Sequence, residues 1–223
     1  MDLNSGLQNK GTAWYDRLTQ MGGGPLNLLT QDFYNRDTVQ VARDLLGKHL
    51  VRVLDDGTKL VCAITETEAY IGRSDKACHA CGYKRTPRTE TLFAPPGTAY
   101  IYLIYGMYHC LNFVTEPAGE PAAVLIRGAE PVENGDIIAE KRFGRKTADM
   151  TAYQRRNFLN GPGKLCKGLA LTREQNGISL LVPESGLYLC DGPAPARIGV
   201  GKRIGIDYAQ EAVDFPRRFW SET

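Results

Sequence analysis

The sequence predicts a single α+β domain built on a mostly antiparallel, curved β-sheet with surrounding helices. Three observations lead to this fold class. Short runs of β-branched and aromatic residues, separated by Gly or Pro turns, occupy much of the first half of the chain. Helical patterns follow mostly later, and Asp56-Gly57 is a strong two-residue hairpin signal. Because strands and helices do not alternate strictly, a parallel sheet is disfavoured.

The elements are expected in the following order. Residues 1–28 contain the break Gly22-Gly23-Gly24-Pro25 and predict a loosely ordered N-terminal arm, which leaves 29–223 as the compact domain. Asp37 is a helix N-cap candidate because the next residues carry an apolar stripe. A long polar loop at 72–97 is a place to expect ligand contacts. The expected helices are 38–48, 133–143, 147–159 and 163–171, and the expected strands are 50–54, 59–70, 98–105, 109–115, 122–127, 178–182, 186–190 and 196–200.

Composition restricts the class of protein. No stretch approaches the roughly 20 apolar residues of a membrane helix, and the N-terminus has no basic segment followed by an apolar one. We therefore expect a cytoplasmic bacterial protein, or a nuclear one if the source is eukaryotic. The net charge of +2 does not by itself indicate nucleic-acid binding, although basic residues do cluster locally, for example at Lys84, Arg85 and Arg88.

The six cysteines are scattered, as reduced thiols usually are in a chain of this size. Cys78-His79-x-Cys81 could supply part of a zinc site, but a second CxxC pair is missing. We expect neither a metal nor another cofactor.

Two carboxylates and a tyrosine alternate in the segment Glu66-Thr67-Glu68-Ala69-Tyr70. In a regular strand these three side chains share one face, which suggests a hydrolytic site beside the long loop. An ordinary solvent-facing row would have the same spacing, and paired carboxylates also suit a sugar glycosidase. Arg127 follows an apolar strand and needs a partner, for which Glu68 is eligible.

Tyrosines form a second group, at positions 100, 102, 105 and 108. Flat aromatic walls suit a nucleic-acid base pulled from its stack, because they replace about 1–3 kcal/mol of stacking per base. Tyrosines packed in a β-rich core would look the same. Taken alone, neither His79 nor Asn112 indicates a ligand contact, because a single His or Asn is more often a hydrogen-bonded structural residue.

Taken together, these segments resemble the alkyladenine DNA glycosylase family, also called the mammalian-type 3-methyladenine DNA glycosylases. The resemblance runs from about residue 38 to 219. It includes, in the family's order, Glu66 to Tyr70, His79 with Thr86-Pro87-Arg88, Pro96-Gly97-Thr98, Tyr102 to Tyr108 with Asn112, Leu125-Ile126-Arg127, Gly161 to Cys166, and Ala196 to Gly201.

The resemblance implies a role for each matching residue. Glu68 would be the general base that draws a proton from the attacking water, held with that water by Arg127 and the backbone carbonyl of Ile198. Asn112 would clash with the 2-amino group of guanine. The remaining implied roles are walls around a flipped base for Tyr70, His79, Tyr102 and Leu125, a wedge for Tyr105, bracing for Met107 and Tyr108, and phosphate contacts for Lys84 and Arg88.

The implied enzyme acts on double-stranded DNA that contains damaged purines: 3-methyladenine, 7-methylguanine, hypoxanthine or ethenoadenine. No lysine falls at a recognised pocket position, so a monofunctional, monomeric glycosylase that leaves an abasic site is expected. The first 28 residues, 136–156 and 116–121 match poorly, and no contacts are transferred there. The alternatives are a non-catalytic binder that distorts DNA with a tyrosine wedge, and a sugar glycosidase.

Overall fold

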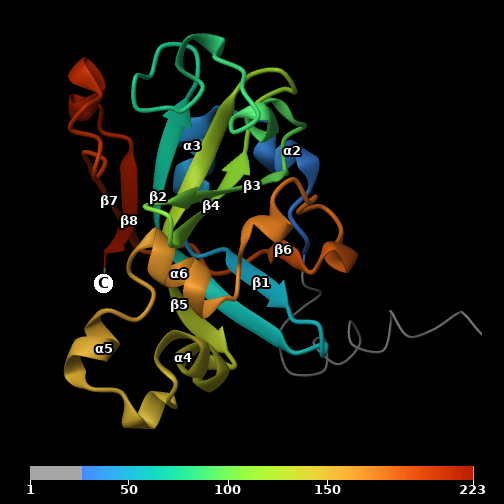
Figure 1. The fold of residues 1–223 in the computed structure, drawn as a ribbon, viewed down its shortest axis with the longest axis vertical. Coiled ribbons are helices and arrows are strands. Elements are labelled where there is room, and N and C mark those ends of the chain that lie inside the picture. Colours follow the sequence, from blue (N-terminus) through green and yellow to red (C-terminus); the bar gives the residue numbers. More distant parts are fainter. Residues whose placement is uncertain (1–26, 223) are drawn as a thin grey trace, which may run out of the picture.

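The computed structural model describes residues 27–222 (Figure 1), so the predicted arm at 1–28 lies almost entirely outside the described residues. Asn27 and Leu28 run beside the strand that ends at Cys190, where Asp191 N–H donates to the Asn27 carbonyl at 2.9 Å. The α+β prediction is confirmed, and every strand pair is antiparallel. The strands are β1 (His49–Val53), β2 (Lys59–Ile71), β3 (Ala99–Ile104), β4 (Tyr108–Val114), β5 (Ala122–Glu133), β6 (Leu187–Cys190), β7 (Arg197–Gly201) and β8 (Arg218–Glu222).

The long strand β2 is the centre of the sheet, whose main path runs β3-β4-β5-β2-β1-β6. One edge of β2 pairs with β5 along almost its whole length. The other edge pairs first with β1 and then, from Glu66 to Glu68, with β8, which in turn pairs with β7. The segment that carries the two carboxylates therefore has a strand on both sides.

Short helices cover the sheet. α3 (Thr38–Asp44) packs on β2 and β5, and α6 (Pro162–Gly168) packs on β4 and β5. The Asp37 side chain accepts from Gln40 N–H at 2.9 Å, so the predicted N-cap is present. The other helices are α2 (Gln31–Tyr34), α4 (Gly135–Phe143) and α5 (Ala152–Arg156), with 3-10 helices at Cys81–Tyr83, Glu90–Phe93, Thr147–Asp149, Arg173–Gln175, Pro183–Ser185 and Gln210–Asp214. No helix within 27–222 is long and apolar enough to span a bilayer.

Several predicted boundaries were wrong. The first long helix ends at Asp44 instead of 48, because Gly47 takes a φ of +82° and donates its N–H to the Ile64 carbonyl. β5 extends to Glu133 because it follows β2, and the expected helix at 147–159 is two short helices. Residues 178–182 form only an isolated bridge at Ser179, and β8 had no predicted counterpart.

The sheet has two distinct faces. One packs on the main core, to which β3, β4 and β5 contribute alternate residues such as Ile101, Phe113 and Ile126. The intervening residues point to the opposite face, where Tyr100, Val114 and Ala123 pack with the partly buried rings of Tyr70 and Tyr102 in a smaller cluster. This second face carries the candidate site.

Candidate active site

A cavity of about 700 Å³ lies on the second face of the sheet, within the range of about 300–1,000 Å³ that is usual for ligand pockets. Strands β2 to β5 supply its base. Its sides come from the loop around His79, the start of α6, and the segment from Ile204 to Tyr208.

One register row crosses the base of this cavity. Tyr100 of β3 pairs with Asn112 of β4, Asn112 pairs with Leu125 of β5, and Leu125 pairs with Glu68 of β2. Because strand partners at one register position share a face, four residues far apart in sequence become neighbours. The predicted residues Asn112, Leu125 and Glu68 are thus brought together.

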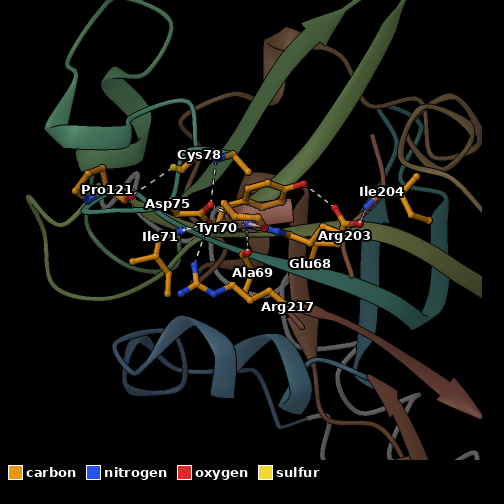
Figure 2. A network of polar contacts seen from close by, with 12 residues as sticks. Glu68, Ala69, Tyr70, Ile71, Asp75, Cys78, Pro121, Arg203, Ile204 and Arg217 are labelled. Atoms are coloured by element: carbon orange, nitrogen blue, oxygen red, sulfur yellow. Dashed lines mark hydrogen bonds and ion pairs between the residues drawn. The ribbon is translucent and has the colours of Figure 1, made fainter. Parts of the chain in front are cut away.

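Glu68 is fully buried, with its carboxylate just beneath the cavity wall. Tyr70 donates its hydroxyl to Oε2 at 2.6 Å, and the Ile204 backbone N–H donates to Oε1 at 2.8 Å (Figure 2). Arg127 Nε lies 3.4 Å from Oε1. All three partners line the cavity, so the carboxylate is in direct contact with groups of the cavity wall.

Arg127 bridges the two carboxylates of the predicted strand. Its Nε donates to Glu66 Oε1 at 3.0 Å, and Arg218 of β8 lies 3.6 Å from the same oxygen. The pairing of Arg127 with Glu68 that the sequence suggested is confirmed. The solvent-facing alternative is wrong for Glu68, because its side chain is fully buried and its carboxylate accepts the Ile204 backbone N–H.

Burial is the largest influence on Glu68 and raises the pKa of its carboxyl group above the ordinary glutamate value. The charge of Arg127 and the hydrogen bonds from Tyr70 and the Ile204 amide oppose this rise, whereas the charge of Glu66 adds to it. A carboxylate with a raised pKa accepts a proton more readily than a solvated one, which suits a general base.

Local irregularity in β2 helps to set this geometry. The register between β2 and β5 shifts on both sides of Glu66, where the chain is bulged. The next residue, Thr67, points to the opposite face and donates its hydroxyl to the Ala42 carbonyl of α3 at 2.7 Å. The strand is therefore fixed from both faces at the point where it presents Glu68.

Three rings pack together on one side of the cavity. The His79 and Tyr102 ring centroids are 4.6 Å apart at 75°, and those of Tyr100 and Tyr102 are 5.3 Å apart. The Arg88 guanidinium lies 5.4 Å from the Tyr102 centroid, and its Nη2 is 3.5 Å from His79 Nε2. Tyr70 also lines the cavity, so the structure gathers the predicted walls Tyr70, His79 and Tyr102.

His79 is a neutral side chain at physiological pH. Burial and, secondarily, the nearby Arg88 charge lower the pKa of its imidazole to about 4. Because a guanidinium can only donate, Nε2 must accept from Arg88, which leaves the proton on Nδ1. Nδ1 then donates to the Tyr100 hydroxyl, which is 3.1 Å away.

Asn112 is held by the backbone around it. Its amide nitrogen donates to the carbonyls of Tyr100 at 3.1 Å and Cys110 at 3.3 Å. Both amide hydrogens are thereby engaged, and the acceptor Oδ1 is the remaining polar atom of the side chain.

The hairpin between β3 and β4 projects at the rim of the cavity. Tyr105 is 82% exposed and has a φ of +53°, a left-handed conformation that is unfavourable for a residue with a side chain. Met107 and Tyr108 are also exposed, and both tyrosines line the cavity. Folding alone gives no reason to hold a large apolar side chain in solvent with a strained backbone.

Comparison with known proteins places this chain in a family. Residues 32–223 match the family model described as "Methylpurine-DNA glycosylase (MPG)". The chain belongs to the methylpurine-DNA glycosylase family. It is therefore a DNA glycosylase, a hydrolase of the N-glycosidic bond that acts in the repair of alkylated DNA.

Curated relatives agree with the family match. A protein of Clostridium perfringens (strain 13 / Type A) is 50% identical over 195 residues, which cover 86% of this chain and 94% of that protein. One of Clostridium novyi (strain NT) is 45% identical over 192 residues, covering 86% and 94%, and one of Bacillus cereus (strain Q1) is 48% identical over 198 residues, covering 85% and 93%. Each is named "Putative 3-methyladenine DNA glycosylase".

One predicted site residue of this methylpurine-DNA glycosylase lies elsewhere. Ile198 is in β7, with β8 between it and β2, and its side chain packs on the main core. The backbone group that contacts Glu68 is instead the amide of Ile204, a donor and not a carbonyl. Lys84 is exposed on the long loop and does not line the cavity, whereas Arg88 reaches the cavity rings.

Several cavity residues of the glycosylase were not among the predicted site residues. The helices α4, α5 and α6 contribute Arg142, Tyr153, Lys164 and Lys167. Arg142 and Tyr153 fall in the poorly matching stretch 136–156, so the family resemblance did not extend to them. No lysine falls at a recognised pocket position, but the folded chain brings Lys164 and Lys167 to the cavity, because the sheet and α6 meet there. Lys164 Nζ is hydrogen-bonded to Asn157 Oδ1 at 2.8 Å and Asn160 Oδ1 at 2.9 Å.

Cys78 and His79 of the glycosylase's Cys78-His79-x-Cys81 segment line the cavity wall. Burial raises the pKa of the Cys78 thiol to about 12, which disfavours the thiolate that binds zinc. Among residues 27–222, no cluster of three or more His, Cys, Asp or Glu residues could hold a metal ion.

Proposed function

We propose that this glycosylase flips alkylated or deaminated purines out of duplex DNA and hydrolyses their glycosidic bond with a water molecule activated by Glu68. The observation that carries the proposal is the position of Glu68, which is fully buried at the end of a register row beneath a cavity walled by aromatic rings. A buried carboxylate of raised pKa beside a cavity is a functional-site candidate on physical grounds.

The proposed reaction balances without a cofactor. The Glu68 carboxylate takes a proton from water while the water oxygen bonds to the anomeric carbon of the nucleotide. The bond between that carbon and the purine nitrogen breaks, and its electron pair leaves with the purine. A purine that is already cationic leaves as a neutral base, whereas hypoxanthine or ethenoadenine requires a proton from an additional acid. Arg127 keeps Glu68 oriented by contacting both carboxylates.

The walls suit a flat, positively charged base. A cation over an aromatic face gains about 0.5–2 kcal/mol, so an electron-rich box favours 3-methyladenine and 7-methylguanine over undamaged purines. The neutral state of His79 supports this preference, because a protonated imidazole at the wall would repel a cationic base. The names of the bacterial relatives support 3-methyladenine among these substrates.

The exposed hairpin supplies a wedge in this proposal. Tyr105 enters the duplex where the damaged nucleotide leaves, and Met107 and Tyr108 brace the adjacent pairs. Flipping costs a few kcal/mol and costs least where pairing is already damaged.

Arg88 contacts a phosphate beside the opening, and Asn112 excludes the 2-amino group of guanine. Measured affinity for lesion DNA of single variants at these positions would test each role.

We also propose a monofunctional reaction on double-stranded DNA by a single copy of the chain. Of the two lysines at the cavity, Lys164 has its ammonium engaged by two asparagine side chains, which opposes its use as a nucleophile on the abasic sugar, and Lys167 is the other amine that the strand-cleavage assay tests. The product strand should therefore stay uncut after the base has left. Light scattering of the enzyme with and without DNA would test the monomeric state.

Replacement of Glu68 by Gln tests the central assignment. The variant cannot accept the proton from water, so release of 3-methyladenine from methylated duplex DNA should fall about 10²–10⁴-fold. Binding to the same DNA should change little, because the amide keeps the shape of the side chain. Chromatography measures the amount of released base, and gel analysis shows whether the DNA strand stays uncut.

Glu66→Gln is the matched control for this experiment. It removes the other carboxylate on Arg127 and should lower the rate far less than Glu68→Gln does. Full activity of Glu68→Gln would contradict the assignment. DNA binding by the wild type without any base release would instead favour the non-catalytic, DNA-distorting alternative.

A further inference from the structure

A buried ion pair lies behind the candidate catalytic carboxylate. Asp75 follows β2, and Arg203 follows β7. Arg203 Nη1 donates to Asp75 Oδ2 at 2.5 Å and Nη2 donates to Oδ1 at 2.8 Å, so the contact is bidentate (Figure 2). Both side chains are completely buried. Asp75 lies in the 72–97 loop where ligand contacts were expected, but neither residue was a predicted site residue.

Asp75 is held as a fixed anchor. Its carboxylate also accepts backbone N–H groups from Ala77 at 3.1 Å and Ile71 at 3.3 Å, and Arg217 Nη1 lies 3.1 Å from Oδ2. Burial would raise the pKa of Asp75, but the hydrogen bonds and charge of Arg203 outweigh it and lower the pKa. The carboxylate is therefore charged at neutral pH, and Arg203 is fixed against it.

Arg203 connects this anchor to both neutral donors on Glu68. Its guanidinium lies 4.6 Å from the centroid of the Tyr70 ring, whose hydroxyl donates to Glu68. The next residue in the chain is Ile204, whose backbone N–H donates to the other carboxylate oxygen. Arg203 Nη1 also donates to the Ala69 carbonyl at 2.8 Å, so the strand between Glu68 and Tyr70 is held by the same group.

We propose that the Asp75–Arg203 pair is a positioning element for the general base, which places the Tyr70 hydroxyl and the Ile204 amide on the Glu68 carboxylate. The inference rests on the proposed role of Glu68. Neither Asp75 nor Arg203 lines the cavity. Both act through Tyr70 and Ile204, which do line it. Outer groups that orient a reactive ligand typically change activity about 10–100-fold at metal sites, and a similar size is expected here.

The surroundings of Glu68 set the expected direction of a pH effect. Arg127 faces it from β5, Cys110 from β4, Arg203 and the Ile204 amide from the segment after β7, and Glu66 and Tyr70 from its own strand. Arg218 of β8 contacts Glu66. Misplacement of the two donors removes hydrogen bonds to the ionised carboxylate. The ionised form of Glu68 then becomes less favoured, so its pKa rises. The acid limb of the rate should therefore move to higher pH.

Arg203→Lys is the main test variant. It keeps the charge but cannot reproduce the bidentate contact together with stacking on Tyr70. With enzyme in excess over radiolabelled methylated duplex DNA, the plateau rate of 3-methyladenine release should fall about 10–100-fold. The half-maximal point of the acid limb should move to higher pH. Affinity for a duplex with a tetrahydrofuran abasic-site analogue should stay within about threefold, because the cavity rim is unchanged.

Arg217→Gln is the matched control. It removes an ion pair with the same Asp75 carboxylate but has no contact with Tyr70 or Ile204, so its plateau rate and acid limb should match the wild type. If Arg203→Lys does not fold, the double variant Asp75→Asn/Arg203→Met replaces it as the test variant, because it leaves neither charge of the pair without its partner.

The possible outcomes are distinct. The proposal would be overturned if Arg203→Lys or the double variant kept the wild-type plateau rate and acid limb while its thermal transition was lowered. The pair would then have a purely structural role. Equal losses in Arg217→Gln would overturn it as well. Retained activity in Glu68→Gln would instead refute the assignment of the base itself.

Discussion

Glu68 illustrates how the surroundings of a single residue give it a chemical role. An exposed glutamate at the same position would be a weak base, because water stabilises its ionised form. Here burial raises the pKa of the carboxyl group, and three donors from separate parts of the chain keep the ionised form accessible. Both influences are needed, since burial alone would leave the group protonated and inactive.

The raised pKa of Glu68 predicts an acid limb in the rate of base release. Only the ionised carboxylate accepts a proton, so the rate should fall as pH drops through the pKa of Glu68. The half-maximal rate should lie above the ordinary glutamate value of about 4.3. Single-turnover rates across pH, with circular dichroism to confirm folding at each pH, measure this point. A rate that stays constant from pH 7 down to about pH 4 would contradict the prediction.

At the scale of elements, the β3–β4 hairpin and the sheet have different tasks. The sheet sets the register row that aligns Asn112, Leu125 and Glu68. The hairpin instead presents Tyr105 to solvent, at the expense of a left-handed backbone at a bulky residue. The geometry of the base of the cavity is thus fixed by strand pairing, whereas its rim depends on a turn.

Replacement of Tyr105 by Asn should separate stability from function. Asn tolerates a positive φ, so the free energy of unfolding should rise by up to about 1 kcal/mol, as chemical denaturation would show. Without the large side chain the flipped state loses support, and base release should fall by more than about tenfold, equivalent to 1.4 kcal/mol.

Val132→Ser is a control for that experiment, because it also removes an exposed apolar side chain but lies in β5, away from the cavity. It should leave base release unchanged. If Tyr105→Asn released base as fast as the wild type, the hairpin would have no role as a wedge.

Across the whole molecule, Asp75 joins the C-terminal strands to the central strand. It lies in the loop after β2 and contacts Arg203 after β7 and Arg217 before β8. The segment that carries Ile204 begins near Arg203 and ends near Arg217. It is therefore attached to the loop after β2 by an ion pair with Asp75 at each end. Stability and the geometry at Glu68 depend on the same side chain.

Asp75→Asn should lower the free energy of unfolding at pH 7 by about 3–5 kcal/mol, because it leaves the buried Arg203 charge without its partner. Asp75→Asn/Arg203→Met should lose less. The lowered pKa of Asp75 stabilises the native state above the unfolded aspartate value of about 3.9, and this contribution is lost as pH falls through the folded pKa. Urea unfolding at several pH values measures both effects. A loss below about 0.5 kcal/mol in the single variant would contradict them.

The amino-acid order alone determined the fold class, most of the strands, and the main chemical group of the site. Alternation predicted that Glu68 and Tyr70 share a face, and the hydrogen bond between them confirms this, whereas Glu66 lies at a bulge and is linked to Glu68 through Arg127. The partner of Arg127 could also be predicted, since an arginine at the end of an apolar strand needs a nearby carboxylate. Such properties depend on local periodicity and residue chemistry.

Other features were decided only by tertiary structure. The contact of the Ile204 amide with Glu68, the Asp75–Arg203 pair, and the presence of Lys164 at the cavity each join segments that are distant in the chain. The length of β5 and the existence of β8 likewise depend on pairing with β2. Local patterns report which way a side chain faces within its own element, but they carry no information on which distant backbone will meet it, because that is set by how the whole chain packs.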